Sequence, residues 1–217
     1  MQILDNLTLP YEGRITKRRD SLERRNNILQ AALRVMVRDG IREVRHRSVA
    51  KEAEVPLSAT TYYFESIDSL IHDAFVYFTE SNLAQIQLLE RSAWIALEEY
   101  QRHQDRVKLK QNLQHFLVNH IKSQVADRDN RLLEWSFRQE ALRDPKLGKL
   151  LTTSQQMTQR AVSHFFESLA HPHASARANV LVGTLLQLEY QMLSSALTED
   201  ELDTTIALLL SSTLFEL

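Results

Sequence analysis

The sequence contains no cysteine, and only four glycines and four prolines occur among its 217 residues. Without cysteine the chain can form no disulfide, thiolate nucleophile or thiolate metal site, and this absence is typical of a reducing cytosol. No apolar run approaches the roughly 20 residues that a membrane-spanning helix needs. Residues 1–13 also lack the basic-then-apolar order of a signal peptide. These absences predict a soluble cytoplasmic protein without a membrane partner.

Glycine and proline are so rare that long helices should dominate, because these two residues are the strongest breakers of regular structure. Apolar residues recur at helical spacing, and no alternating pattern indicates a strand, so the predicted fold class is all-α. Ser21, Ser66 and Thr198 are expected to cap three helices. The predicted helices cover residues 21–39, 46–53, 57–64, 66–90, 92–102, 105–126, 129–142, 146–169, 174–197 and 199–214.

Charge is distributed unevenly along the chain. Residues 1–51 carry 12 lysines and arginines against 6 acidic residues, whereas residues 52–217 carry 14 against 22. A basic end followed by an acidic remainder is typical of a protein that meets nucleic acid through one end. The alternative is a basic face that only meets solvent, and the charge pattern is compatible with both.

The stretch VAKEAEVPLSATTYYF, residues 49–64, predicts two short helices separated by a tight turn. Together with the longer helix before them, they form a helix-turn-helix unit. Ala50 is small enough to let the helices cross closely, and the first turn of a helix tolerates Pro56, which lacks an amide hydrogen. The outer face of the second short helix has no carboxylate, which suits insertion into the DNA major groove. That face carries Leu57, Ser58, Thr61 and Tyr62.

This part of the chain resembles the TetR family of transcriptional regulators. The resemblance covers residues 24–71, from the helix that ends in RDG, through VRHRSVAKEAEVPLSATTYYF, to ESIDSLI at the start of the next helix. Three positions depart from the family pattern. Glu54 stands where the turn usually has glycine, Arg45 where a capping threonine is common, and Ile67 where a basic residue often occurs. A positive φ at Glu54 would cost about 1 kcal/mol.

The resemblance implies a domain organisation and a function. It implies a basic flexible leader over residues 1–20, a helix-turn-helix DNA-binding domain over 21–65, and a helical effector-binding and dimerisation domain over 66–217. Such a protein is a repressor that binds a palindromic double-stranded DNA operator as a homodimer and is released by a small-molecule effector, with no cofactor. The residues expected to contact DNA are Arg47, His46, Leu57, Ser58, Thr61, Tyr62 and Tyr63, with leader residues Arg14, Lys17, Arg18 and Arg19 as additional candidates.

The larger half supplies candidates for the effector pocket and the dimer interface. Pockets are usually apolar with a few placed polar groups, and the candidates are Phe78, Phe116, His120, Glu134, Trp135, Arg138, Met157 and Gln187. Arg138 suits a carboxylate ligand, although Glu134 lies one helical turn earlier and can pair with it instead. Apolar residues on the last two long helices are expected to meet a partner subunit, and these are Leu181, Leu185, Leu188, Met192, Ile206, Leu209 and Leu210.

Two other functions remain open from the sequence. One is a DNA-binding regulator that answers to a protein partner, and the other is a helical interaction module whose basic end meets acidic proteins. An enzyme is disfavoured because the chain has no glycine-rich phosphate loop and no nucleophile elbow. His115 and His120 are five residues apart, so they do not share a helix face as metal ligands would.

Overall fold

The computed structural model describes residues 9–215, apart from the side chains of residues 83–86, 88, 89 and 215. Helices and short turns account for these residues, and no strand occurs within them, so the all-α prediction is confirmed. The elements in chain order are α1 (Arg19–Asp39), η1 (Ile41–Glu43), α2 (His46–Glu52), α3 (Leu57–Tyr63), α4 (Ile67–His103), α5 (Arg106–Ala126), α6 (Arg128–Ala141), α7 (Pro145–Ser168), α8 (Ala174–Leu193), α9 (Glu199–Leu210) and the π-helical turn η2 (Ser211–Phe215). None of the helices within residues 9–215 combines the length and apolar character needed to cross a membrane.

The chain folds into two compact units. Among the described residues, the unit that we call the head comprises 9–84 and 129–154, and the unit that we call the body comprises 85–128 and 155–215. The predicted boundary between residues 65 and 66 does not separate these units, because the first part of α4 packs into the same core as the helix-turn-helix.

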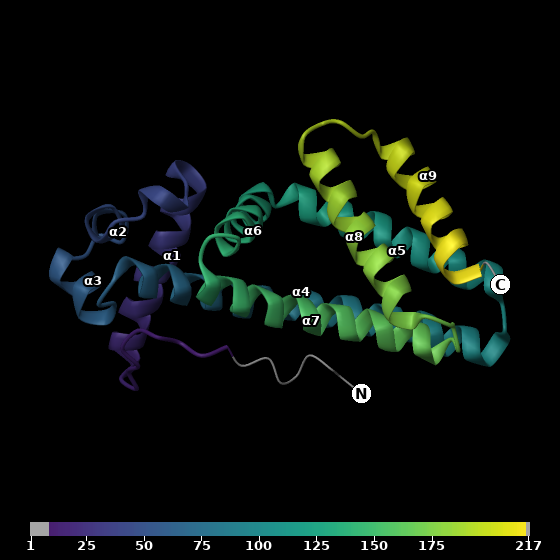
Figure 1. The fold of residues 1–217 in the computed structure, drawn as a ribbon, viewed down its shortest axis with the longest axis horizontal. Helices are drawn as coiled ribbons and strands as arrows, with labels where there is room; N and C mark the ends of the chain where they lie inside the picture. The colour runs from purple at the N-terminus through teal and green to yellow at the C-terminus, as the bar shows by residue number, and fades with distance from the viewer. Residues whose placement is uncertain (1–8, 216–217) are drawn as a thin grey trace. The chain divides into compact units, whose positions relative to one another are not determined.

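The head is built around the apolar face of α1. This face is buried because its apolar residues recur at helical spacing, and it consists of Ile28, Leu29, Ala32, Val35 and Met36. α2 and α3 lie next to each other against this helix (Figure 1). On the other side of the core, Phe137 of α6 packs edge-on against Phe75 of α4, with ring centroids 5.1 Å apart. The core therefore supports the two short helices with rigid neighbours.

The body is a helical bundle in which α5 lies beside α8 and α9 (Figure 1). Its core includes Ile121 of α5, Phe166 of α7 and Ile206 of α9, all fully buried. At the start of α9, the Glu201 amide donates to the Thr198 hydroxyl at 3.3 Å, and the Glu201 carboxylate accepts from the Thr198 amide at 2.8 Å. The prediction of Thr198 as an N-cap is confirmed by this reciprocal arrangement.

Several predicted helix limits need correction. α4 runs without a break from Ile67 to His103, where the sequence predicted two helices, because no glycine or proline interrupts that stretch. α8 ends at Leu193 instead of residue 197, since the chain reverses at Ser195 with φ +57°. α1 begins at Arg19, so Ser21 is not its cap. The Ser66 cap is confirmed, because its hydroxyl accepts from the Ser69 amide at 3.0 Å.

Candidate nucleic-acid interface

A tight turn connects α2 to α3. The Val55 amide donates to the Ala50 carbonyl at 3.0 Å, and Ala50 itself is 5% exposed. Glu54 adopts φ +54°, the left-handed conformation that glycine usually supplies, so the positive φ considered for this position is present. Pro56 has φ −58° and precedes α3 directly, where no helical amide hydrogen is needed.

α1 fixes the end of α2 through polar side chains. The Asn27 amide donates to the Ala53 carbonyl at 2.9 Å. Arg34 and Arg38 both donate to the Glu52 carboxylate, at 2.8 and 2.7 Å. Hydrogen bonds from Arg34 and Arg38 hold the pKa of Glu52 below its ordinary value. The orientation of α2 relative to α1 is thus set by directional contacts in addition to apolar packing.

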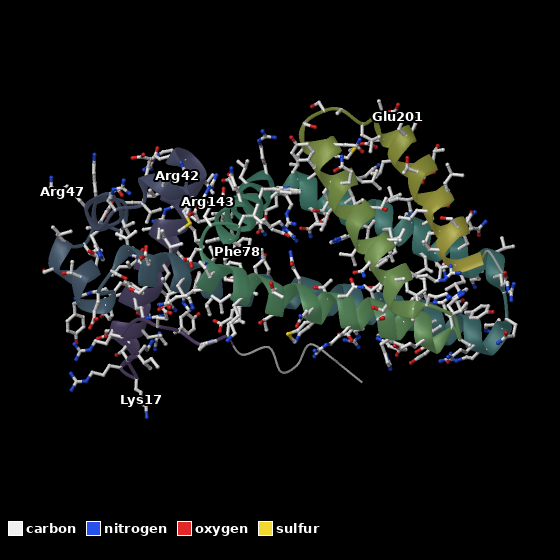
Figure 2. The ribbon with its side chains drawn as sticks, in the orientation of Figure 1. Lys17, Arg42, Arg47, Phe78, Arg143 and Glu201 are labelled. Atoms are coloured by element: carbon white, nitrogen blue, oxygen red, sulfur yellow. The ribbon has the colours of Figure 1, made fainter. Side chains whose placement is uncertain are left out.

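The start of α2 is capped despite the missing threonine. The Ser48 hydroxyl accepts from the Arg45 amide at 3.0 Å, and the Arg45 guanidinium donates to the Val44 carbonyl at 3.0 Å. Arg47 is exposed and points away from α2 (Figure 2), as a phosphate contact requires. His46 is half-buried, and burial lowers its pKa, so it is neutral at neutral pH and adds no charge for phosphate binding.

The outer face of α3 is open to solvent. Leu57 is 45% exposed and Tyr62 is 52% exposed, and Ser58 and Thr61 lie on the same exposed face. Tyr63 is different, because it is only 5% exposed and its hydroxyl is 2.8 Å from the Ser21 hydroxyl. The structure therefore gives no support for Tyr63 as a DNA contact. Its ring shares the inner face of α3 with the residue three positions earlier, as helical spacing requires.

The described part of the leader is docked instead of flexible. Leu9 is 3% exposed and belongs to the head core. The Glu12 and Gly13 amides donate to the two carboxylate oxygens of Asp73 in α4, at 2.7 and 2.9 Å. The Arg14 amide donates to the Tyr63 carbonyl at the end of α3, at 2.8 Å. The structure thus shows residues 9–14 packed and hydrogen-bonded against the head, whereas residues 1–8 lie outside the described chain.

Asp73 is the centre of a buried network that the sequence analysis missed. Its side chain is fully buried and accepts from the Arg25 guanidinium at 2.5 Å. Burial alone would raise the pKa of Asp73, but hydrogen bonds from His72 and from the Glu12 and Gly13 amides, together with the Arg25 charge, hold it below its ordinary value. A carboxylate within the apolar stripe of α4 was the signal available in the sequence, since such a group needs a partner.

Tyr11 closes this network on its outer side. The Arg25 guanidinium lies 4.3 Å from the centre of the Tyr11 ring, and the Tyr11 hydroxyl donates to Glu80 at 2.5 Å. Burial, followed by the hydrogen bond to Glu80, raises the pKa of Tyr11. Arg25 itself is only 4% exposed.

The basic residues of the leader have different surroundings. The Arg14 guanidinium lies 4.1 Å from the centre of the exposed Tyr62 ring. Arg19 pairs with Glu23 one helical turn later at 2.8 Å, on the solvent side of α1. Lys17 is exposed and projects from the head (Figure 2). Arg14 is therefore a leader cation that contacts the outer face of α3 directly.

Four of the predicted pocket residues lie in the head. Phe78 is 8% exposed and packs against Phe137, with ring centroids 5.6 Å apart. The Glu134 carboxylate accepts hydrogen bonds from the Arg138 guanidinium at 2.7 Å and from the Arg131 guanidinium at 2.6 Å. The pairing of Arg138 with Glu134, which was the alternative to ligand binding, is thus present. Trp135 is half-buried, and its ring lies 6.0 Å from the Arg138 guanidinium.

The other four predicted pocket residues lie in the body. Phe116 and Met157 are half-buried, whereas Gln187 is exposed, so its placement inside a pocket is not supported. His120 lies 3.9 Å from the carboxylate of Glu189, which is only 5% exposed and was not predicted. A separate small hollow lies at the turn between α4 and α5. That hollow contains none of the predicted residues, and its lining includes Glu99, Tyr100, His103 and Lys108.

The predicted dimer interface needs a correction. Leu188, Ile206 and Leu210 are 3%, 0% and 1% exposed, because they pack in the core of the body itself. Leu181 and Leu209 are also buried there, whereas Leu185 and Met192 are half-buried. Other apolar side chains of the same helices do reach the surface. These are Val180, Tyr190 and Leu208, which are 53%, 52% and 66% exposed.

Within the described part of the chain, no group of three or more histidine, aspartate or glutamate side chains is arranged to hold a metal ion. The candidate site is the surface formed by α2, α3 and the docked leader, where the exposed face of α3 lies beside Arg14.

The fold is similar to that of several solved regulators. A protein described as a TetR-family transcriptional regulator from Mesorhizobium loti has a TM-score of 0.70 at 15% identity, over 91% of this chain and 98% of that chain. A member of the TetR family from Streptomyces coelicolor has a TM-score of 0.55 at 25% identity, over 86% and 98%. The multidrug binding protein EbrR, solved in complex with proflavin, has a TM-score of 0.56 at 26% identity, over 86% and 99%. No protein-family model and no curated protein matches the sequence.

Proposed function

We propose that this chain, which has the fold of the TetR-family transcriptional regulators, is a repressor that binds a palindromic DNA operator as a homodimer. The observation that carries this proposal is the outer face of α3. Leu57, Ser58, Thr61 and Tyr62 are all exposed there, on a helix held by α1 and α2. A short helix presented in this way is the recognition element of a helix-turn-helix protein.

The chemistry of this face suits the DNA major groove. Hydroxyl groups such as those of Ser58 and Thr61 bond base edges or phosphates, and the methyl group of threonine contacts the thymine methyl. Arg47 at the start of α2 is placed to bond a phosphate, which supplies affinity and fixes the position of α3 in the groove. None of the proposed contact residues carries a carboxylate, which would be repelled by the DNA phosphates.

A dimer follows from the geometry of DNA. Two recognition helices must reach successive major grooves about 34–36 Å apart to bind a palindrome. We assign the interface to α8 and α9, where Val180 and Leu208 are exposed and Leu185 and Met192 are half-buried. Exposed apolar side chains on neighbouring helices are typical of surfaces that a partner covers.

We further propose that a small molecule releases the protein from DNA. Support comes from EbrR, a protein of 26% identity that was solved in complex with proflavin. A ligand changes DNA affinity only if it binds the DNA-competent and DNA-incompetent arrangements with different affinity. His120 and the buried Glu189 are the polar pair in the body that such a ligand would meet.

The experiment that tests DNA binding is selection from a pool of random duplexes with the full-length protein. We expect enrichment of one sequence with two-fold symmetry. Tyr62→Ala should then abolish binding to the enriched duplex and leave the fold intact, because Tyr62 is 52% exposed. Leu142→Ala is the control, since Leu142 is 88% exposed and lies in the turn after α6. If no sequence is enriched, or if Tyr62→Ala binds like the wild type, α3 is not the recognition helix.

A further inference from the structure

We propose that the Arg14 guanidinium and the Tyr62 ring together contact a DNA phosphate. Residues 11–14 form a docked arm that carries Arg14, and the buried Asp73 holds this arm in position. This inference rests on the proposed DNA-binding function. It goes beyond that function by assigning a contact outside the helix-turn-helix and a side chain in α4 that determines where this contact lies.

The first observation is that only glycine fits at position 13. A Cβ atom on Gly13 would lie 2.7 Å from an Asp73 carboxylate oxygen and 2.7 Å from the Phe64 ring. Such distances are shorter than any van der Waals contact, so the arm or its neighbours would have to move. The close approach of the backbone is therefore built into the sequence at this position.

The second observation is that three consecutive amides of the arm are held. The Glu12 and Gly13 amides donate to Asp73 at 2.7 and 2.9 Å, and the Arg14 amide donates to the Tyr63 carbonyl at 2.8 Å. The arm thus bridges α4 and the end of α3. Because the backbone is fixed up to Arg14, the side chain of Arg14 starts from a defined point next to the recognition helix.

The third observation is the stacking of Arg14 on Tyr62. The guanidinium carbon lies over the ring, 4.1 Å from its centre, which is the position of a cation–π contact. The N–H groups of a guanidinium lie in its plane, and within the described residues no side chain accepts a hydrogen bond from those of Arg14. The edge of the group therefore remains available for a phosphate, which arginine binds with two parallel hydrogen bonds.

The position of this pair favours phosphate over a base edge. Recognition helices contact bases mainly through their N-terminal residues. Tyr62 lies near the C-terminal end of α3, and the negative end of the helix dipole there also favours a nearby cation. Stacking on Tyr62 restricts the rotamers of Arg14 before DNA arrives, so less conformational entropy is lost on binding.

The closing experiment measures binding to the duplex that wild-type protein selects from a random pool, at several salt concentrations. For Arg14→Ala we expect about tenfold weaker binding and a salt dependence reduced by about one phosphate contact. Arg14→Lys should recover only part of the loss, because lysine keeps the charge but not the planar stacking surface. Ile15→Ala is the matched control, since the neighbouring Ile15 is 76% exposed and binding should not change.

A double-mutant cycle tests the positioning role. Gly13→Ala should weaken binding about as much as Arg14→Ala, and the double variant should be no weaker than either single variant. If Gly13→Ala only destabilised the head, its effect would instead multiply with that of Arg14→Ala, and this result would overturn the positioning role. Asp73→Asn, which keeps the side-chain shape but not the charge, should behave like Gly13→Ala in the same cycle.

Hydrogen exchange provides a readout that needs no DNA. The Glu12 and Gly13 amides are bonded to Asp73 and should exchange slowly in the wild type and Arg14→Ala, and faster in Gly13→Ala. Fast exchange in the wild type would overturn the docked arm. Wild-type affinity in Arg14→Ala would overturn the composite contact and leave the proposed function standing, whereas failure to enrich any duplex would remove both.

Discussion

Replacing Asp73 by alanine removes the carboxylate that Arg25, Glu12 and Gly13 share. Arg25 is 4% exposed, so its charge would stay buried without the oxygen that lies 2.5 Å away in the wild type. Two arm amides would also lose their acceptors. Removing one partner from a buried ion pair typically costs about 3–5 kcal/mol, because the other charge remains uncompensated. We expect a loss of about 4 kcal/mol in the stability of the head, with the arm amides regaining bonds to water.

The two tryptophans allow this loss to be measured in the head alone. Trp94 lies in the body and Trp135 in the head, so a Trp94→Phe background leaves a single reporter of head unfolding. With a urea dependence of about 2 kcal/mol per molar for a unit of this size, the midpoint of the Trp135 fluorescence transition should fall by about 2 M.

Two matched variants interpret the result. Asp73→Asn keeps one acceptor oxygen but loses the charge, so its midpoint should lie between those of the wild type and Asp73→Ala. Glu52→Gln disrupts ion pairs with Arg34 and Arg38 at the surface, and its midpoint should move far less, because solvent screens exposed pairs. If Asp73→Ala shifts the midpoint no more than Glu52→Gln does, Arg25 has another partner and the expected penalty is wrong.

Three further predictions concern other parts of the chain. Glu54→Gly should stabilise the head by about 1 kcal/mol in urea unfolding, because Glu54 has φ +54°. Gln104→Gly should stabilise the body by a similar amount, because Gln104 has φ +55°. Destabilisation by both substitutions would show that neither turn is strained. The pKa of Asp73 is lowered in the folded head, so its contribution to stability should be constant above pH 5 and disappear as the pH falls below about 4, where the urea midpoints of the wild type and Asp73→Asn should converge. If the proposed dimer forms through α8 and α9, Leu208→Arg should halve the mass measured by light scattering, whereas Ile95→Arg should not. An unchanged mass would rule out an interface at Leu208.

The helix-turn-helix was predictable because its signals are local. α2 and α3 begin at the predicted residues and end one residue early, since a turn, a small residue at Ala50 and the position of Pro56 define them without distant contacts. Ser58, Thr61 and Tyr62 were placed on the exposed face for the same reason. Tyr63 was predicted to contact DNA although helical spacing already put it on the inner face, and only its bond to Ser21 shows that the hydroxyl is engaged as well.

The proposed dimer surface was less predictable, because apolar periodicity identifies the buried face of a helix but not the neighbour that covers it. Leu188 and Ile206 recur at the spacing expected for an interface, yet they face α5 and the rest of the body core. The exposed side chains that we propose for the interface, such as Val180 and Leu208, lie outside that pattern.

Gly13 suggests a flexible segment in the sequence, but in the structure it lies at a close contact within the docked arm. A glycine three residues after Pro10 and next to basic side chains indicates a flexible leader when only neighbours in the chain are considered. Gly13 is instead required by a carboxylate 60 residues later, which leaves no room for a Cβ atom. The need for glycine at position 13 is thus explained by its contact with Asp73, and Gly13→Ala distinguishes a docked arm from a flexible leader. Faster amide exchange with weaker DNA binding is expected of a docked arm, whereas a flexible leader would tolerate alanine.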